Sequence, residues 1–164
     1  MKTLLLMRHA KSSWKDESLS DFDRPLNGRG RKAAEAIGRY IKKQGMVPDL
    51  VLSSPAVRAR ETTSIVSTIA RLRTDLRYDE RIYEADPQRL IEVISQIEEN
   101  VASVLLVGHN PGIEELLGLI VGCSQHMPTG AFAKIRLGGI DKWSKVSEAK
   151  ATLDLMIKPK DIIE

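Results

Sequence analysis

The sequence predicts a single α/β domain of the three-layer α/β/α type with a mostly parallel central sheet, and three observations support this class. Short apolar runs alternate with longer amphipathic segments across residues 1–164, which is the element order of α/β proteins. The segments 3–7 and 104–107 are nearly continuous apolar runs, as expected of central strands covered on both faces. A hydrophobic fraction of 42% suits one ordinary core, and no linker or repeat divides the chain.

The strands are predicted from apolar runs that end at turn residues. They cover residues 3–7, 50–53, 76–78, 104–107, 131–137 and 152–157. The first, second and fourth strands end at similar polar groups, namely Arg8 and His9, Ser54, and His109. If these strands are parallel neighbours, the polar groups emerge at one edge of the sheet. That carboxyl edge is where open α/β sheets bind their ligands.

Four helices are predicted from apolar residues at helical spacing. The second is expected to begin at Pro55 with Ser54 as its cap, and the fourth at Pro111 with Asn110 as its cap. The free N-termini of these two helices would lie at the same sheet edge, where they favour an anion. The other two helices are expected at residues 28–44 and 87–99.

Charge is distributed unevenly along the chain. The net charge is +3, but residues 1–60 hold thirteen Lys and Arg against six Asp and Glu, whereas the remainder holds twelve against sixteen. A basic N-terminal third is compatible with nucleic-acid binding. However, the charges are not interleaved with aromatic residues and no nucleic-acid motif occurs, so we expect no nucleic-acid partner. An anionic small group or an acidic protein partner accounts for the asymmetry equally well.

Several classes of protein are excluded by the composition. No apolar stretch approaches the roughly 18 residues of a membrane span, and the run before Arg8 is too short for a signal peptide. A single Cys123 excludes an intrachain disulfide and a cysteine-rich zinc site. Three dispersed histidines provide no local pair of metal ligands. We therefore expect a cytoplasmic monomer with no membrane partner, no metal and no cofactor.

The polar residues expected at the sheet edge suit a phosphoryl group. Arg8 and Arg58 offer planar guanidinium groups that match phosphate oxygens. Positive neighbours lower the pKa of a histidine, so we expect that His9 and His109 are not protonated together. A neutral imidazole in such a pocket is a nucleophile or a base. Phosphoryl transfer through a phosphohistidine fits these parts.

Four motifs carry a resemblance to a known family. RHAKSSW, DRPLNGRG, SSPAVRARET and GHNPG occur in this order, between residue 8 and about residue 130 of the chain. Together they resemble the histidine phosphatase superfamily, also called phosphoglycerate mutase-like, and within it the short SixA-type phosphohistidine phosphatases. Ala10 stands where the superfamily usually has the glycine of RHG. Lys11 and Lys15 stand where mutases often have glutamate and asparagine, which weakens the case for a sugar-phosphate mutase.

The resemblance implies roles for four residues. It places the nucleophilic histidine at His9, beside the phosphate-binding Arg8. It places the second phosphate-binding arginine at Arg58, and not at Arg60, from the S-P-x-x-R-A pattern. The second catalytic histidine of the family falls on His109.

Two further phosphate contacts are implied by the resemblance, each with an alternative. In SixA-like members the arginine of the R-P-L segment faces the pocket, which implicates Arg24. This arginine could instead pair with Asp21 or Asp23. Ser12 resembles a phosphate-contacting position of the family, but a serine there also suits a turn.

Two residues are candidates for the group that donates a proton to the leaving group. Many relatives have a glutamate shortly after the third strand, and alignment of DERIYEAD places it at Glu80, with Glu84 in reserve. Glu80 could also be a solvated charge beside Arg81. We expect Lys11 at the rim of the pocket and Arg60 on a solvated helix face.

The expected function is that of a metal-independent phosphatase that forms phosphohistidine on His9. The short chain leaves little room for a lid, and an exposed basic pocket suits a phosphohistidine carried by a partner protein, by resemblance to SixA. The alternatives are a small-molecule phosphomonoesterase of the same superfamily and a non-catalytic module that binds phosphoproteins.

Overall fold

The computed structural model describes residues 1–163 and is built on one mixed sheet of six strands. Their order across the sheet is β3-β2-β4-β1-β5-β6. Parallel pairing joins the first four of these strands, and β5 runs antiparallel to both of its neighbours. The strands are β1 (Lys2–Arg8), β2 (Leu50–Ser53), β3 (Asp75–Tyr78), β4 (Ser103–Gly108), β5 (Phe132–Gly138) and β6 (Lys150–Ile157).

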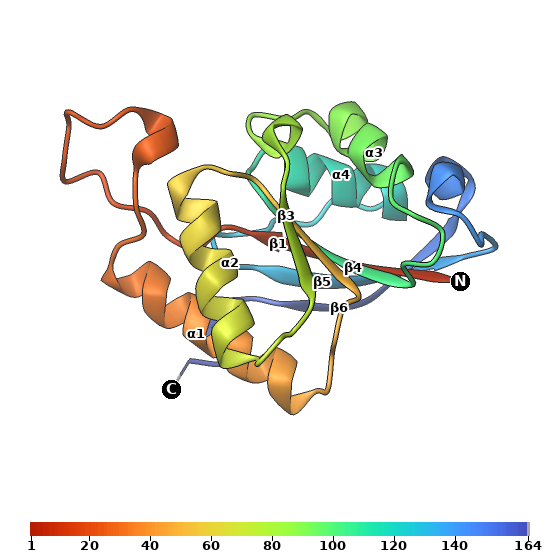
Figure 1. Ribbon diagram of the computed structural model, residues 1–164, viewed down its shortest axis with the longest axis horizontal. Coiled ribbons are helices and arrows are strands. Elements are labelled where there is room, and N and C mark those ends of the chain that lie inside the picture. Colours follow the sequence, from red (N-terminus) through yellow and green to blue (C-terminus); the bar gives the residue numbers. More distant parts are fainter. Residues whose placement is uncertain (164) are drawn as a thin grey trace.

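Helices cover both faces of this sheet, as predicted (Figure 1). One face packs against α1 (Gly28–Lys43) and α2 (Val57–Ile69), and the other against α3 (Pro87–Ser95) and α4 (Gly112–Val121). Successive residues of β1 alternate between the two cores, because side chains of a strand point to opposite faces. The three-layer α/β/α fold is therefore confirmed. Four short 3-10 helices complete it: η1 (Asp21–Asp23), η2 (Glu80–Ile82), η3 (Trp143–Glu148) and η4 (Pro159–Asp161).

Three helix boundaries differ from the prediction. The helix predicted at 87–99 ends at Ser95, because the next two residues form tighter i to i−3 hydrogen bonds. Ser54 does not cap α2: its hydroxyl accepts from Ala56 N, two residues on, and the helix begins only at Val57. The fourth helix begins at Gly112 with Pro111 at the cap position, but Asn110, the predicted cap, accepts through Oδ1 from Glu114 N of its first turn at 3.2 Å.

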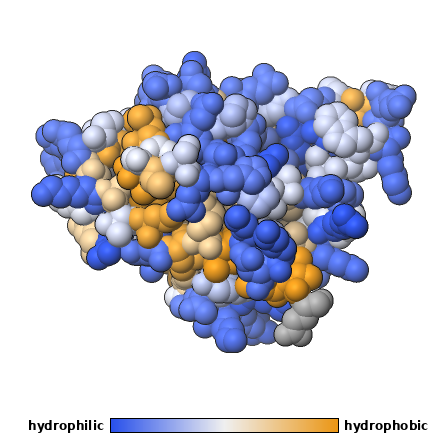
Figure 2. Space-filling model, turned by 180° about the vertical axis from the view of Figure 1, so that it is seen from behind, coloured by the Kyte–Doolittle hydropathy of each residue, from blue (hydrophilic) through white to orange (hydrophobic). Residues whose placement is uncertain are grey.

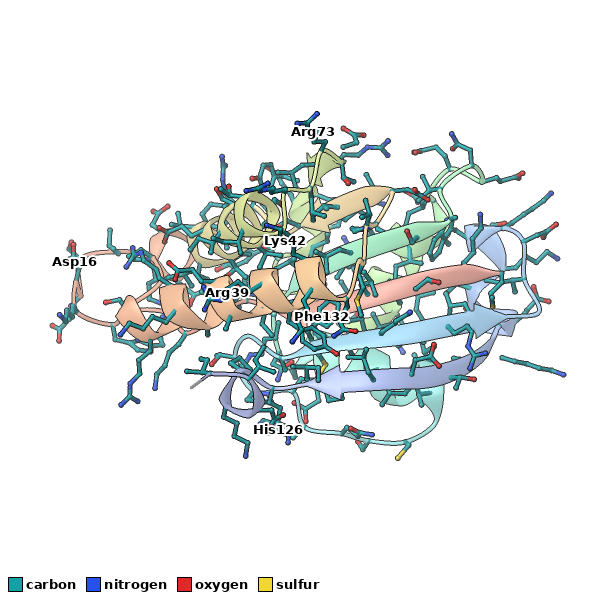
Figure 3. All side chains as sticks on the ribbon, turned by 90° about the horizontal axis from the view of Figure 1, so that it is seen from below. Asp16, Arg39, Lys42, Arg73, His126 and Phe132 are labelled. Atoms are coloured by element: carbon teal, nitrogen blue, oxygen red, sulfur yellow. The ribbon has the colours of Figure 1, made fainter. Side chains whose placement is uncertain are left out.

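The segment 11–27 leaves the end of β1 as a long excursion that projects from the body of the protein (Figure 1, left). Its two ends are joined by a bridge between Ser12 and Leu26. Leu26 N also donates to Glu61 Oε1 of α2 at 2.9 Å. Asp16 lies at its outer tip, far from the sheet (Figure 3). The excursion is thus fixed at its base and exposed at its end.

Side chains sort between core and surface as the apolar patterns require. Phe132 of β5 is fully buried between the sheet and α1, whereas Arg39 and Lys42 of α1 lie on the outside (Figure 3). Viewed from behind, the surface is mostly hydrophilic and is interrupted by a band of hydrophobic atoms (Figure 2). No helix among residues 1–163 is long and apolar enough to cross a membrane.

Candidate active site

A pocket of about 560 Å³ lies at the carboxyl ends of β1, β2 and β4. These three strands are parallel neighbours, so the polar groups that follow them meet at one edge, as predicted. Four of the residues implied by the motifs line it together: Arg8, His9, Arg58 and His109. Their side chains come from two strand ends and from the first turn of α2.

His9 is held in one tautomer by its surroundings. Its side chain is buried, and Nδ1 lies 2.7 Å from the carbonyl oxygen of Ala10. A carbonyl oxygen can only accept, so Nδ1 carries the proton and donates it. Nε2 therefore keeps its lone pair, and Arg58 Nε donates to it at 3.3 Å. The nitrogen left with a lone pair is the one that faces the arginine.

Both histidines of the pocket are neutral at pH 7. Burial, with Arg58, Arg8 and Arg24 adding to it, lowers the pKa of His9 to about 4. Burial, then the neighbouring His9 and Arg58, lowers the pKa of His109 to about 3. The two rings lie close together, with centroids 5.0 Å apart. His9 is consequently in the form that can act as a nucleophile.

Two buried nitrogens in the pocket have no hydrogen-bond partner. His109 Nε2 is hydrogen bonded to Ser54 Oγ at 2.7 Å, but Nδ1 has no partner. Arg8 Nη1 donates to Met127 O at 3.2 Å, but Nε has no acceptor. Within residues 1–163 these are the only buried side-chain nitrogen or oxygen atoms left in this way. Such atoms are costly to bury, and both belong to residues that line the pocket.

Arg8 is supported from behind by Glu114 of α4, a residue that the motifs did not single out. Glu114 Oε2 accepts from Asn110 Nδ2 at 2.8 Å and from Met127 N at 3.3 Å. Asn110 Nδ2 also donates to Met127 O, the carbonyl that binds Arg8. Burial lowers the pKa of Arg8, and the charge of Glu114 opposes that shift. The carboxylate thus fixes the segment on which the guanidinium rests.

Asp21 joins the two other arginines of the pocket. Its carboxylate accepts from Arg58 Nη2 at 3.0 Å and from Arg24 Nη2 at 3.1 Å. Tyr83 Oη donates to the same carboxylate at 2.6 Å, and this hydrogen bond is the main reason that the pKa of Asp21 lies below its usual range. Arg24 therefore pairs with Asp21 and also lines the pocket, and its contact with phosphate stays a prediction.

Ser12 lies beside Arg24 rather than on the pocket wall. Its hydroxyl accepts from Arg24 Nη1 at 2.6 Å, and it is not among the residues that line the pocket. The guanidinium of Arg24 also stacks on the indole of Trp14, and its carbon lies 3.5 Å from the ring centroid. The predicted phosphate contact of Ser12 stays a prediction, and the contact observed is one that orients Arg24.

The two candidate proton donors are placed differently. Glu80 begins the turn η2, is exposed, and does not line the pocket, because the chain reaches the pocket only at Tyr83. Glu84, the reserve candidate, does line it. Arg60 is exposed, as expected of a solvated helix position, and lies over the ring of Tyr78 at 4.6 Å. Lys11 is exposed too, but it does not line the pocket, so its predicted place at the rim stays a prediction.

Tyr83 and Trp14 line the pocket and were missed from the sequence. Tyr83 packs edge-on against His109, with ring centroids 5.4 Å apart, and burial is the main reason that its pKa rises to about 12. Aromatic residues make up only 4% of the chain, and this scarcity was the one signal that could have drawn attention to them. No group of three or more His, Cys, Asp or Glu suited to a metal occurs in the described part of the chain.

Comparisons with known proteins agree with this geometry. A profile of the histidine phosphatase superfamily (branch 1) matches residues 4–88. An uncharacterized protein of Mycobacterium tuberculosis is 36% identical over 158 residues, which cover 90% of this chain and 96% of that protein. An Agrobacterium tumefaciens protein assigned as a phosphohistidine phosphatase SixA has a similar structure, with a TM-score of 0.84 and 30% identity over 96% of this chain and 98% of that one.

The structure of a protein histidine phosphatase SixA complexed with tungstate shares the fold, with a TM-score of 0.85 and 22% identity over 98% of this chain and 99% of that one. The chain therefore belongs to the histidine phosphatase superfamily (branch 1), and it is of the SixA type.

Proposed function

We propose that this protein is a phosphatase that removes the phosphoryl group from phosphohistidine on a partner protein, by way of a phosphohistidine on its own His9. The observation that carries the proposal is the pairing of a neutral His9 with two unpartnered buried nitrogens in one pocket. Arg8 Nε is a donor without an acceptor, and His109 Nδ1 lacks a partner. When Ser54 Oγ donates to His109 Nε2, Nδ1 carries the proton, and oxygens of a transferring phosphoryl group would then accept from both nitrogens.

The reaction runs in two displacements. In the first, His9 Nε2 attacks phosphorus in line, a bond from Nε2 to phosphorus forms, and the bond from phosphorus to the substrate nitrogen breaks. Arg8, Arg24 and Arg58 offset the charge on the phosphoryl oxygens. In the second, water attacks phosphorus, phosphate leaves, and His9 regains its lone pair. The proton on His9 Nδ1, held by Ala10 O, stabilises the ring while Nε2 carries the phosphoryl group.

A phosphohistidine substrate fits the placement of the carboxylates. An imidazole protonated on its second nitrogen leaves as a neutral ring and needs no proton from the enzyme. Glu80, the candidate proton donor, does not line the pocket. A small phosphomonoester is the second candidate, because Glu84 lines the pocket and could protonate an alkoxide leaving group.

The test is to trap the intermediate. A histidine-phosphorylated carrier protein bearing labelled phosphate is mixed with the enzyme and quenched in base, which preserves phosphohistidine. Label should appear on His9 within one turnover and be absent from His9→Ala. Label that persists in His9→Ala would overturn the assignment. Turnover of phosphomonoesters with no turnover of the carrier would select the second candidate, and tight binding without any turnover would indicate a binding module.

A further inference from the structure

Trp14 stands at the mouth of the pocket with one face of its ring open. It lines the same pocket as His9, yet its residue is 74% exposed whereas His9 is 6% exposed. His9 is therefore on the floor and Trp14 at the entrance. The guanidinium of Arg24 lies against the indole, 3.5 Å from the ring centroid. Arg24 covers one face of the indole, so the exposed remainder of the ring is available to a substrate that enters the pocket.

In-line attack determines which part of a substrate passes this entrance. The nucleophile and the leaving group lie on opposite sides of phosphorus. Because His9 attacks from the buried floor, the leaving group extends outward, toward the exposed residues. The part of the substrate that differs between one phosphorylated compound and another is thus the part that reaches the level of Trp14.

Two carboxylates at the same mouth indicate the chemistry of that leaving group. Glu84 and Glu115 line the pocket and are exposed, and neither side chain forms a hydrogen bond or ion pair within the described residues. Carboxylates at the entrance repel the phosphoryl dianion, so they are favourable only if the leaving group brings N–H donors or positive charge. A protonated phosphoimidazole brings both, and its ring is flat.

We propose that the open face of Trp14 is a leaving-group subsite on which the planar imidazole of phosphohistidine stacks, with its N–H directed to the carboxylates of the mouth. The subsite rests on the proposed function and adds a specificity residue to it. It favours a phosphohistidine over a phosphorylated aliphatic group, since only the ring gains the stacking contact.

The experiment compares two substrates with the same phosphorus–nitrogen bond. Phosphohistidine has the ring, and phosphoramidate lacks it. The quantity measured is the ratio of kcat/KM for phosphohistidine to kcat/KM for phosphoramidate. Trp14→Ala should lower this ratio roughly three- to tenfold, the size of one aromatic stacking contact, and Trp14→Phe should restore most of it. Because Trp14 is exposed, neither change disturbs the core.

Tyr78→Ala is the matched control. Tyr78 is another exposed aromatic residue that lies on an arginine, Arg60, but it is outside the pocket, so its removal should leave the ratio unchanged. An unchanged ratio in Trp14→Ala, with equal losses on both substrates, would overturn the subsite and make Trp14 only a support for Arg24. If the wild-type protein forms no phosphoenzyme with either compound, the proposed function itself fails, and the subsite falls with it.

Discussion

Arg58 Nε donates a hydrogen bond to His9 Nε2 across 3.3 Å, and this contact shows which ring nitrogen of His9 carries the lone pair. The positive charge of Arg58 also adds to burial in holding His9 neutral. In the proposed reaction Nε2 gives up this hydrogen bond before it attacks phosphorus, because its one lone pair cannot serve both partners. The same arginine side chain would then stabilise the phosphoryl oxygens.

The first prediction concerns the titration of His9. Burial and the nearby arginines lower its pKa to about 4, so the ring should stay neutral from pH 7 down to about pH 5. The imidazole nitrogen shifts of His9 measured by NMR should report this value. Arg58→Leu removes one positive neighbour and should raise the pKa, whereas Arg60→Leu, at an exposed arginine outside the pocket, should leave it unchanged. Titration of wild-type His9 near 6.5 would contradict the geometry.

The same shift predicts a pH dependence of stability. An unfolded histidine titrates near 6.5 and His9 near 4, so the unfolded chain binds more protons between these values. The free energy of unfolding should fall as the pH is lowered through this window, with His9 contributing on the order of 3 kcal/mol. Urea unfolding of wild type and His9→Asn at pH 7 and pH 4 measures the difference. Equal losses in the two proteins would show that His9 is not buried neutral.

The third prediction compares two arginines in the first turn of α2. Arg58 contacts His9 and Asp21 and is buried, whereas Arg60 is exposed and lies over Tyr78. Arg58→Ala should lower kcat/KM by about 100-fold or more, as loss of one preorganised donor does. Arg60→Ala should have little effect. Similar losses in both variants, measured on one labelled phosphohistidine substrate, would mean that the motif was read in the wrong register.

Some residues of the pocket could be predicted from the sequence and others could not, and the difference depends on the elements that hold them. Arg8 and His109 follow apolar strands, and the pairing of parallel strands is enough to bring them together. Asp21 begins the short turn η1 and Tyr83 directly follows the turn η2, and their hydrogen bond joins residues 62 positions apart. No periodicity fixes the path of such segments. For the same reason alignment alone did not show that Glu84, and not Glu80, reaches the pocket.

The fourth prediction tests Asp21 as the residue that positions two arginines. Asp21→Asn keeps the size of the side chain but removes the charge that Arg24, Arg58 and Tyr83 share. We expect kcat/KM to fall and the pKa of Tyr83, now about 12, to move down toward its ordinary value, because a negative acceptor is lost. Ultraviolet titration of Tyr83 measures the shift, with Tyr83→Phe to assign it. Asp23→Asn, an exposed neighbour, is the matched control, and an unchanged Tyr83 in Asp21→Asn would refute the link.

The last prediction separates two glycines in the first turn of α1. A Cβ added to Gly30 would lie 2.1 Å from Lys11 O, at the start of the excursion that carries Asp21 and Arg24, whereas a Cβ on Gly28 meets nothing within 4 Å. Gly30→Ala must push the excursion away from the helix, so it should cost about 1–3 kcal/mol of unfolding free energy and also lower kcat/KM. Gly28→Ala should be neutral or slightly stabilising, since alanine favours a helix. Urea unfolding and turnover measured on both variants decide the matter: a stable Gly30→Ala with full activity would mean that this close approach does not hold the excursion in place.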